Sequence, residues 1–341
     1  MLTVMMMLRR SLLFGLVVLL VACGGTAPAA PADPAAAAPE PALTTVTLAL
    51  SYIPNVQFAP YYVAQQKGYY RDAGIDVVFD YNFETDTLQR AATAPPNAPI
   101  IAHGSGLSVM LARQQGIPVQ MVMQQYQQFP VVFFGKEDVQ LTSPTDLQGL
   151  QIGIPGRFGA SYYALLALLY ASDQQERDLN VQEIGFNQFQ LVLEDAIDVA
   201  AGYAMNEPVR LREATGGASV LRVADFFPLV ADGLIVSEQL IAERPELVQG
   251  FVEASMRGLR DTLENPDEAF QISLAFIPEA NLSTPEFERA VLQESLPYWT
   301  SARLGAMSED MWAKSHQFLL DLNLLQSPIE VEQAYTNAFV E

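Results

Sequence analysis

Rings and amides gather in one short stretch of the sequence, YIPNVQFAPYY at residues 52–62. This stretch follows directly after a β-branched run at residues 46–50. Tyr52 and Phe58 offer flat rings, and Asn55 offers both a hydrogen-bond donor and an acceptor. Together they predict one wall of a closing ligand cleft. The alternative interpretation is a hydrophobic staple followed by a surface turn.

A second loop, His103-Gly104-Ser105-Gly106, follows a predicted strand and opens a predicted helix. Small residues let backbone N–H groups approach a ligand, and a helix N-terminus favours polar acceptor atoms. We therefore expect Ser105 to contact a ligand. His103 is better interpreted as a hydrogen-bonded structural residue, with ligand contact as the alternative.

A third loop, at residues 154–162, is a glycine-rich turn between a predicted strand and a predicted helix. It lacks the lysine and hydroxyl of a P-loop, so the sequence does not support nucleoside triphosphate chemistry. Phe158, Ser161 and Tyr162 are expected to hold a ring and its polar edge.

A fourth loop, at residues 201–208, brings a ring, an amide and a carboxylate together in Tyr203, Asn206 and Glu207. Glu207 would accept a hydrogen bond from a ligand, or it would cap the following helix; the sequence leaves both interpretations open. The glutamine-rich run at residues 124–130 is interpreted as a solvated hinge, with Tyr126 the residue expected to face a ligand cleft.

The elements that position these loops alternate between strand and helix from Val46 onward. Predicted strands cover residues 46–50, 75–81, 100–102, 119–123, 151–154, 181–184 and 199–203. Predicted helices cover residues 60–73, 106–115, 160–170 and 189–195, and beyond about Leu234 the pattern is almost wholly helical, at residues 246–263, 266–276, 285–296 and 308–322. Two such series predict two α/β lobes, the first with a mostly parallel sheet. Ligands of open α/β sheets bind beyond the carboxyl ends of the strands, which is where the four loops fall.

The composition excludes several classes of function. The 39 acidic and 18 basic residues give the 341-residue chain a net charge of -21, which repels the phosphates of nucleic acids. One cysteine and two histidines cannot build a disulfide framework, a structural zinc site or an iron–sulfur cluster. The acidic residues Glu194, Asp195 and Asp198 are most simply charges at a helix end. We therefore predict no metal site, no cofactor and no catalytic residue.

The N-terminus carries a targeting signal. Arg9 and Arg10 precede an almost continuous apolar run that closes at Leu20-Val21-Ala22-Cys23-Gly24. This pattern predicts a lipoprotein signal peptide at residues 1–22 and a lipid on Cys23; a plain secretory signal with a chance cysteine is the alternative. The Pro/Ala-rich residues that follow predict an extended tether at 23–45.

Four segments resemble the NMT1/THI5-like group of solute-binding proteins for ABC importers. They are YIPNVQFAPYYVAQQKGYYRDAGIDV (52–77), LTSPTDLQGLQIGIPG (141–156), AGYAMNEPVRL (201–211) and RPELVQGFVEASMRG (244–258). The resemblance implies a type II periplasmic-binding-protein fold, in which two crossing strands join two lobes and a ligand lies between them. It places the first lobe at residues 46–125 plus 232–341 and the second at 126–231.

The resemblance also implies a planar nitrogen heterocycle as the ligand. The thiamine-pyrimidine binders of this group usually carry a tryptophan before the Pro-Asn element and a histidine shortly after it. This chain has Tyr52 and Phe58 at those places, a form that is similar to the branch assigned to riboflavin uptake. Riboflavin is therefore the first expected ligand, and a thiamine-precursor pyrimidine, such as hydroxymethylpyrimidine or formylaminopyrimidine, is the second.

The group contains pyrimidine synthases as well, so an enzyme is the remote alternative. Those enzymes carry a cysteine-rich iron-binding motif, which a chain with Cys23 as its one cysteine lacks. We expect instead a monomeric binding protein on the extracytoplasmic face of the cell membrane, anchored through Cys23. Its expected partners are a membrane permease and the ATPase that drives it.

Overall fold

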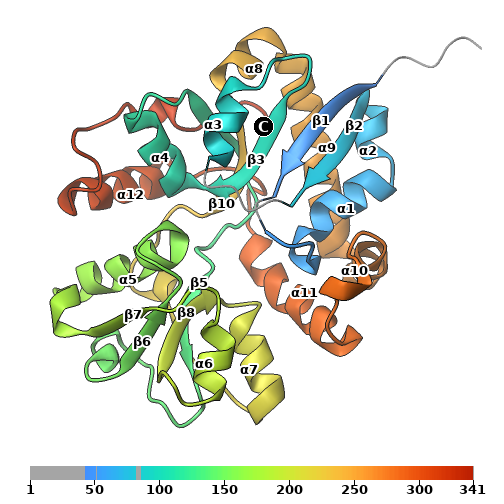
Figure 1. Cartoon of the computed structure of the whole chain (residues 1–341). Helices are drawn as coiled ribbons and strands as arrows, with labels where there is room; N and C mark the ends of the chain where they lie inside the picture. Colours follow the sequence, from blue (N-terminus) through green and yellow to red (C-terminus); the bar gives the residue numbers. More distant parts are fainter. Residues whose placement is uncertain (1–42, 51, 82–85, 341) are drawn as a thin grey trace, which may run out of the picture. The chain divides into compact units, whose positions relative to one another are not determined.

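Two five-stranded sheets organise the computed structural model, which describes residues 43–50, 52–81 and 86–340 (Figure 1). The strand order of the first sheet is β2-β1-β3-β10-β4. Its strands are β1 (Thr44–Ala49), β2 (Ile75–Asp80), β3 (Ile100–Ser105), β4 (Val119–Gln124) and β10 (Asp232–Ser237). We call the part of the chain around this sheet the first lobe.

The second sheet has the strand order β7-β6-β8-β5-β9 and forms the centre of the second lobe. Its strands are β5 (Val131–Gly135), β6 (Gln151–Ile154), β7 (Asn180–Glu183), β8 (Val199–Tyr203) and β9 (Ser219–Arg222). In both sheets three neighbouring strands run parallel, and one antiparallel strand interrupts the order. Two α/β lobes of this kind confirm the predicted fold class.

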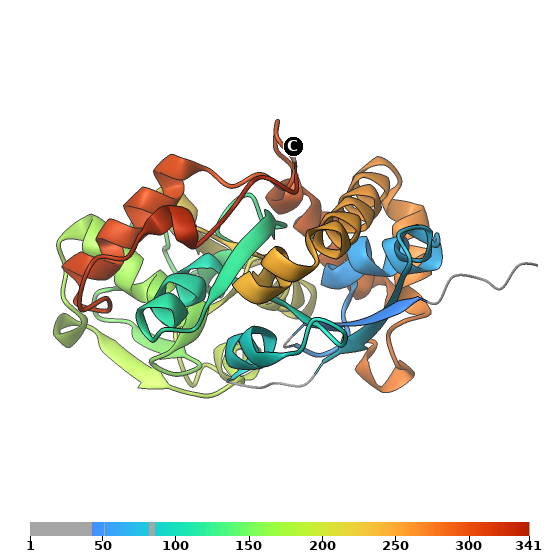
Figure 2. The same ribbon diagram turned by 90° about the horizontal axis from the view of Figure 1, so that it is seen from above.

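Helices cover both sheets (Figure 2). The α-helices are α1 (Ala59–Gln66), α2 (Tyr69–Asp72), α3 (Thr87–Thr93), α4 (Gly106–Gln114), α5 (Gly159–Ser172), α6 (Gln188–Leu193), α7 (Glu207–Thr215), α8 (Glu238–Glu243), α9 (Pro245–Glu264), α10 (Pro266–Leu274), α11 (Pro285–Trp299) and α12 (Glu309–Asp321). Short 3₁₀ turns are η1 (Val56–Phe58), η2 (Pro144–Leu147), η3 (Glu176–Asp178), η4 (Val223–Asp225), η5 (Glu279–Asn281) and η6 (Val331–Gln333). None of the helices in the described part of the chain is both long and apolar enough to cross a membrane.

Three sequence-based expectations about these elements were wrong. The helix expected at 60–73 breaks into α1 and α2, because Gly68 between them takes a left-handed φ of 78°. The residues of the expected loop 103–106 instead finish β3 and begin α4. The expected helical region after about Leu234 contains strand β10, all of whose residues are buried. A strand covered on both faces has no alternating pattern that would distinguish it from a helix.

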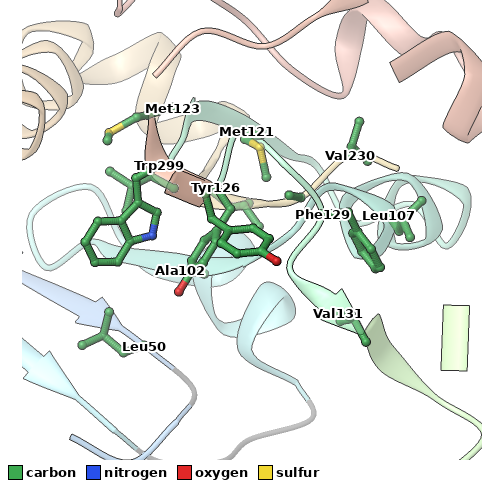
Figure 3. Packing of buried hydrophobic residues seen from close by; sticks show 14 of the residues in the cluster. Leu50, Ala102, Leu107, Met121, Met123, Tyr126, Phe129, Val131, Val230 and Trp299 are labelled. Carbon is green, nitrogen blue, oxygen red and sulfur yellow. The ribbon is translucent and has the colours of Figure 1, made fainter. Parts of the chain in front are cut away.

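The chain passes between the lobes twice, after β4 and before β10. The backbone N–H groups of Gln125 and Tyr126 both donate to the carbonyl oxygen of Asp232, at 3.0 Å, so the two passages lie side by side. The ring of Tyr126 packs edge-on against Trp299 with centroids 6.0 Å apart, in the cluster of Figure 3. The predicted lobe boundaries at 126 and 232 fall in these passages, and the division of the chain at those residues stays a prediction.

The C-terminal helices contact the second lobe on two sides. On α12, Phe318 packs against Tyr170 of α5, and the Tyr170 hydroxyl donates to Asp321 at 2.6 Å. On α11, Glu294 pairs with Arg212 of α7 at 3.2 Å. These contacts connect the two lobes at places away from the crossing strands.

The crossing of α1 and α9 predicts a strong effect of a small substitution, Gly258→Ala. A Cβ atom at position 258 would overlap the carbonyl oxygen of Pro60 and would lie 3.0 Å from the backbone nitrogen of Ala64. Backbone atoms cannot turn aside, so the helices must separate. We expect the free energy of unfolding to fall by about 1–3 kcal/mol, measured by urea denaturation. Gly250→Ala, on the same helix but near the side chain of Ala73, is the matched control and should cost less. Equal stability of Gly258→Ala and the wild type would contradict the expectation.

Candidate functional site

The loops after β1 and β8 meet across the two lobes. Nδ2 of Asn206, beyond the end of β8, donates to the hydroxyl oxygen of Tyr52, beyond the end of β1, at 3.1 Å. Each loop follows the carboxyl end of a strand, so the carboxyl edges of the two sheets face each other here. The structure thus brings together two predicted site residues that are 154 positions apart.

Burial makes the hydroxyl of Tyr52 harder to ionise. Burial is the main cause that raises the pKa of its hydroxyl to about 12, and the nearby charge of Glu207 adds to the effect. The hydroxyl therefore stays protonated at neutral pH. A protonated, half-buried tyrosine presents both a ring face and a neutral polar group.

Tyr203 and Glu207 complete the second-lobe side of this region. The Tyr203 hydroxyl donates to Oδ2 of Asp232 at 3.0 Å, and the Tyr203 backbone N–H donates to Oε2 of Glu207 at 2.8 Å. Burial raises the pKa of both carboxyls, that of Asp232 to about 6. Glu207 therefore holds the turn between β8 and α7 in this structure, but no side-chain hydrogen bond caps α7. Its role toward a ligand stays a prediction.

Asn55 and Phe58 are covered by protein. Asn55 caps η1, because its Oδ1 accepts from the backbone N–H of Gln57 at 2.9 Å, and its side chain is 7% exposed. Phe58 is 5% exposed and packs edge-on against Tyr62 and His103. The predicted contact of both with a ligand is untested. In this structure their side chains are buried and make contacts that stabilise the loop after β1.

A buried polar chain connects that loop with the passage between the lobes. Nε2 of His103 lies 3.0 Å from Oε1 of Gln125, whose Nε2 donates to the carbonyl oxygen of Gln57. The Tyr126 hydroxyl donates to Oε1 of Gln57 at 3.3 Å. Burial lowers the pKa of His103 to about 4, so its ring is neutral at pH 7. These contacts agree with the structural interpretation of His103. They also place Tyr126 beneath the loop.

Ser105 lies at the start of α4. It is 8% exposed, and its Oγ accepts from the backbone N–H of Leu107 at 3.1 Å. The N-cap role explains why a serine stands between β3 and α4. Contact with a ligand is again untested.

The loop after β6 differs from the loop after β1, because the ring of Phe158 is exposed to solvent. Phe158 is 61% exposed, whereas Ser161 and Tyr162 are partly buried on the first turn of α5. The Tyr162 hydroxyl donates to Oε2 of Glu176 at 3.0 Å. Phe158 is therefore the predicted second-lobe residue with the most ring surface left to cover.

Two residues near this region carry no signal in the sequence. Asp232 reaches Tyr203 only because β10 returns to the first sheet beside the passage between the lobes. Glu288 on α11 is 2% exposed, and its Oε1 accepts from the backbone N–H of Ser283 at 3.0 Å. Its charge is the smallest of the causes that raise the pKa of Tyr52. Neither position stands in a loop after a strand, which was the criterion available from the sequence.

Two surface depressions lie elsewhere in the described part of the chain. One is lined by Lys136, Glu137, Asp138 and Thr215, and the other lies between α7 and α11. Neither touches a predicted ligand residue. Among the described residues, no group of three or more His, Cys, Asp and Glu side chains could hold a metal ion.

The family model described as NMT1/THI5 like matches residues 55–269, which include most of these elements. The chain belongs to the NMT1/THI5-like family. Among curated relatives of this family, the riboflavin-binding protein RibY of Chloroflexus aurantiacus is 55% identical over 98% of this chain and 99% of its own. The formylaminopyrimidine-binding protein of Halalkalibacterium halodurans is 27% identical over 88% of this chain and 92% of its own.

Solved structures with much lower sequence identity share the fold. The periplasmic aliphatic sulphonate binding protein SsuA of Escherichia coli superposes with a TM-score of 0.68 at 11% identity, over 87% of this chain and 99% of that one. The ligand-binding component of an ABC-type import system from Staphylococcus aureus superposes with a TM-score of 0.65 at 13% identity, over 87% of this chain and 98% of that one. The predicted type II periplasmic-binding-protein fold and the predicted family are both confirmed. Cys23, the predicted signal peptide and most of the predicted tether lie outside the described residues.

Proposed function

We propose that this protein is the substrate-binding lipoprotein of an ABC importer, that it captures a planar nitrogen heterocycle between its lobes, and that riboflavin is this ligand. The observation that carries the proposal is the hydrogen bond of Asn206 to Tyr52 across the two carboxyl edges. A ligand at that place would contact both lobes at once. The name of the relative that is 55% identical supports riboflavin as the ligand.

Lobe closure is the proposed mechanism. Contacts that a ligand makes with both lobes exist only when the lobes are close together, so ligand binding favours the closed state. The passages near Tyr126 and Phe227 would absorb the dihedral change. The closed protein would then deliver the ligand to a membrane permease.

Aromatic side chains from both lobes suit a fused ring system. Tyr52 comes from the first lobe, and Tyr203 and Phe158 come from the second. Stacking contributes about 0.5–1.5 kcal/mol for each ring pair beyond the burial of apolar area. Glu207, Asn206 and Ser161 are the proposed partners of the ligand's polar edge.

A thiamine-precursor pyrimidine is the second candidate. The relative that supports it is named for formylaminopyrimidine and is 27% identical to this chain. A relative named as a pyrimidine phosphate synthase, from Legionella pneumophila, is 24% identical and keeps an enzyme as the remote candidate. We propose a binding protein and no enzyme, because the higher identity is to a binding protein.

The location is also a proposal. A lipid on Cys23 would hold the protein at the extracytoplasmic face of the cell membrane, and the Pro/Ala-rich tether would let the lobes reach the permease. We propose that it acts as a monomer.

The proposal predicts that riboflavin emission is quenched when the purified protein is added, because stacking on tyrosine rings quenches flavin fluorescence. Riboflavin should also raise the midpoint of thermal unfolding by mass action. Hydroxymethylpyrimidine and formylaminopyrimidine serve as comparison ligands in the same titrations. A thermal shift with a pyrimidine and none with riboflavin would replace the first candidate by the second.

A further inference from the structure

We propose that Phe186 is a specificity-determining residue of the ligand site, and that together with Phe158 it forms an aromatic wall which only a fused-ring ligand is long enough to reach. This inference rests on the proposed function. Phe186 stands in the turn between β7 and α6. Three properties of Phe186 support its role: its place at the edge of the second sheet, the backbone hydrogen bonds around it and its exposure.

The order of the strands places Phe186 beside the predicted site. Strand β6 pairs in parallel with β7 on one side and with β8 on the other. All three therefore end at the same edge, and the loops that follow them carry Phe186, Phe158 and Asn206 in that order. Since Asn206 reaches Tyr52, this edge of the second lobe faces the first lobe.

The loops with Phe186, Phe158 and Asn206 form a row along the edge of the second sheet, and the spacing of the strands sets the length of this row. Adjacent strands lie ~4.8 Å apart, so the loop with Phe186 stands roughly 10 Å from the loop with Asn206. A single pyrimidine ring held at Tyr52 and Asn206 would not extend that far. Three fused rings held at the same place would extend along the row toward Phe158 and Phe186.

Hydrogen bonds hold the backbone around Phe186 to the neighbouring loop. The N–H of Ile184 donates to the carbonyl of Ile154 at 2.9 Å, and the N–H of Gly185 donates to that of Pro155 at 3.1 Å. Nδ2 of Asn187 donates to the carbonyl of Ile184 at 3.1 Å. A backbone turn fixed in this way has little conformational entropy left to lose when a ligand binds.

Ion pairs hold the Phe158 side of the wall. The guanidinium of Arg157 donates to Oε1 of Glu176 at 2.9 Å and also pairs with Glu183, the last residue of β7. Arg157, the residue directly before Phe158, is thus paired with the strand that leads to Phe186. Such exposed ion pairs add little stability, but in this structure they connect the loop after β6 with β7 and with η3.

The exposure of the two rings distinguishes them from other apolar side chains. Phe158 is 61% exposed and Phe186 is 66% exposed, whereas the other large exposed hydrophobic residues in the described part of the chain reach at most 48%. Both rings stand in loops at the same edge of the second sheet, so we infer that a ligand covers them there. Covering them contributes free energy of binding through both burial and stacking.

The test is the affinity of Phe186→Ala for riboflavin and for lumichrome, measured by fluorescence titration, with hydroxymethylpyrimidine as the single-ring ligand. We expect affinity for both fused-ring compounds to fall about ten-fold and any pyrimidine affinity to stay unchanged. Phe186→Tyr keeps the ring and should bind like the wild type. Val78→Ala, which shortens an exposed apolar side chain on β2, is the surface control and should also bind like the wild type.

Two outcomes would overturn the inference, and they are distinguishable. If the wild type binds riboflavin and Phe186→Ala binds it equally well, Phe186 is not part of the site and the proposed function stands. If the wild type binds neither riboflavin nor lumichrome, the proposed function fails together with the inference.

Discussion

The substitution Tyr52→Ala is expected to weaken riboflavin binding by about 10- to 100-fold, which is roughly 1.4–3 kcal/mol. It removes a ring from the first-lobe side of the proposed site. It also removes the hydroxyl that accepts from Asn206 at 3.1 Å, which is the contact between the loops after β1 and β8. Lost stacking, lost burial and a lost hydrogen bond add to this size.

Fluorescence titration with riboflavin measures the loss of affinity. The variant Tyr52→Phe separates the contribution of the ring from that of the hydroxyl. Phenylalanine keeps the ring and loses the hydroxyl, so we expect a loss of only a few-fold. Tyr69→Ala is the matched control, because the Tyr69 hydroxyl also has a partner, Asp261, but Tyr69 lies on α2, away from the loops that face the second lobe. Wild-type affinity in Tyr52→Ala would remove Tyr52 from the site. An equal loss in Tyr69→Ala would mean that the effect is one of stability.

The substitution Asp232→Asn is expected to stabilise the folded protein by about 3 kcal/mol at pH 7.5. Burial raises the pKa of Asp232 from 3.8 to about 6. A carboxyl with a raised pKa contributes stability that is fully present below pH 3.8 and is lost as the pH rises to about 6. Above that pH the wild type keeps an ionised carboxylate in a buried place. Asparagine carries no charge, and its Oδ1 can still accept from the Tyr203 hydroxyl.

Urea denaturation at two pH values tests this prediction. The advantage of Asp232→Asn should fall to about half at pH 5, because much of the penalty for ionising the wild-type carboxyl is absent there. Asp195→Asn is the matched control: Asp195 is an exposed carboxylate paired with Lys136, and its replacement should change stability by less than about 1 kcal/mol at either pH. A less stable Asp232→Asn at pH 7.5 would show that the ionised carboxylate is better solvated than its burial indicates.

The sequence predicted the parts of the fold that depend on neighbours along the chain. Strands β6 and β8 and helices α9 and α12 lie within one or two residues of their predicted bounds, because their apolar periods and end signals are local. The break at Gly68 was missed, since a glycine inside a helical pattern has no obligatory conformation. Strand β10 was missed because its burial on both faces depends on β3 and β4, more than 100 residues earlier.

The same distinction between local and long-range information applies to the candidate site. The sequence by itself determined the family and the loops in which rings and amides follow strands, while the expectation from a net charge of -21 that nucleic acid is not bound stays a prediction. Only the tertiary structure decided that Tyr52 meets Asn206, that Asn55 and Phe58 lie beneath the surface, and that Asp232 faces Tyr203. Residue types and spacing report what a side chain can do. Whether it is covered, and by what, depends on contacts between segments that are far apart in the chain, and no local pattern records them.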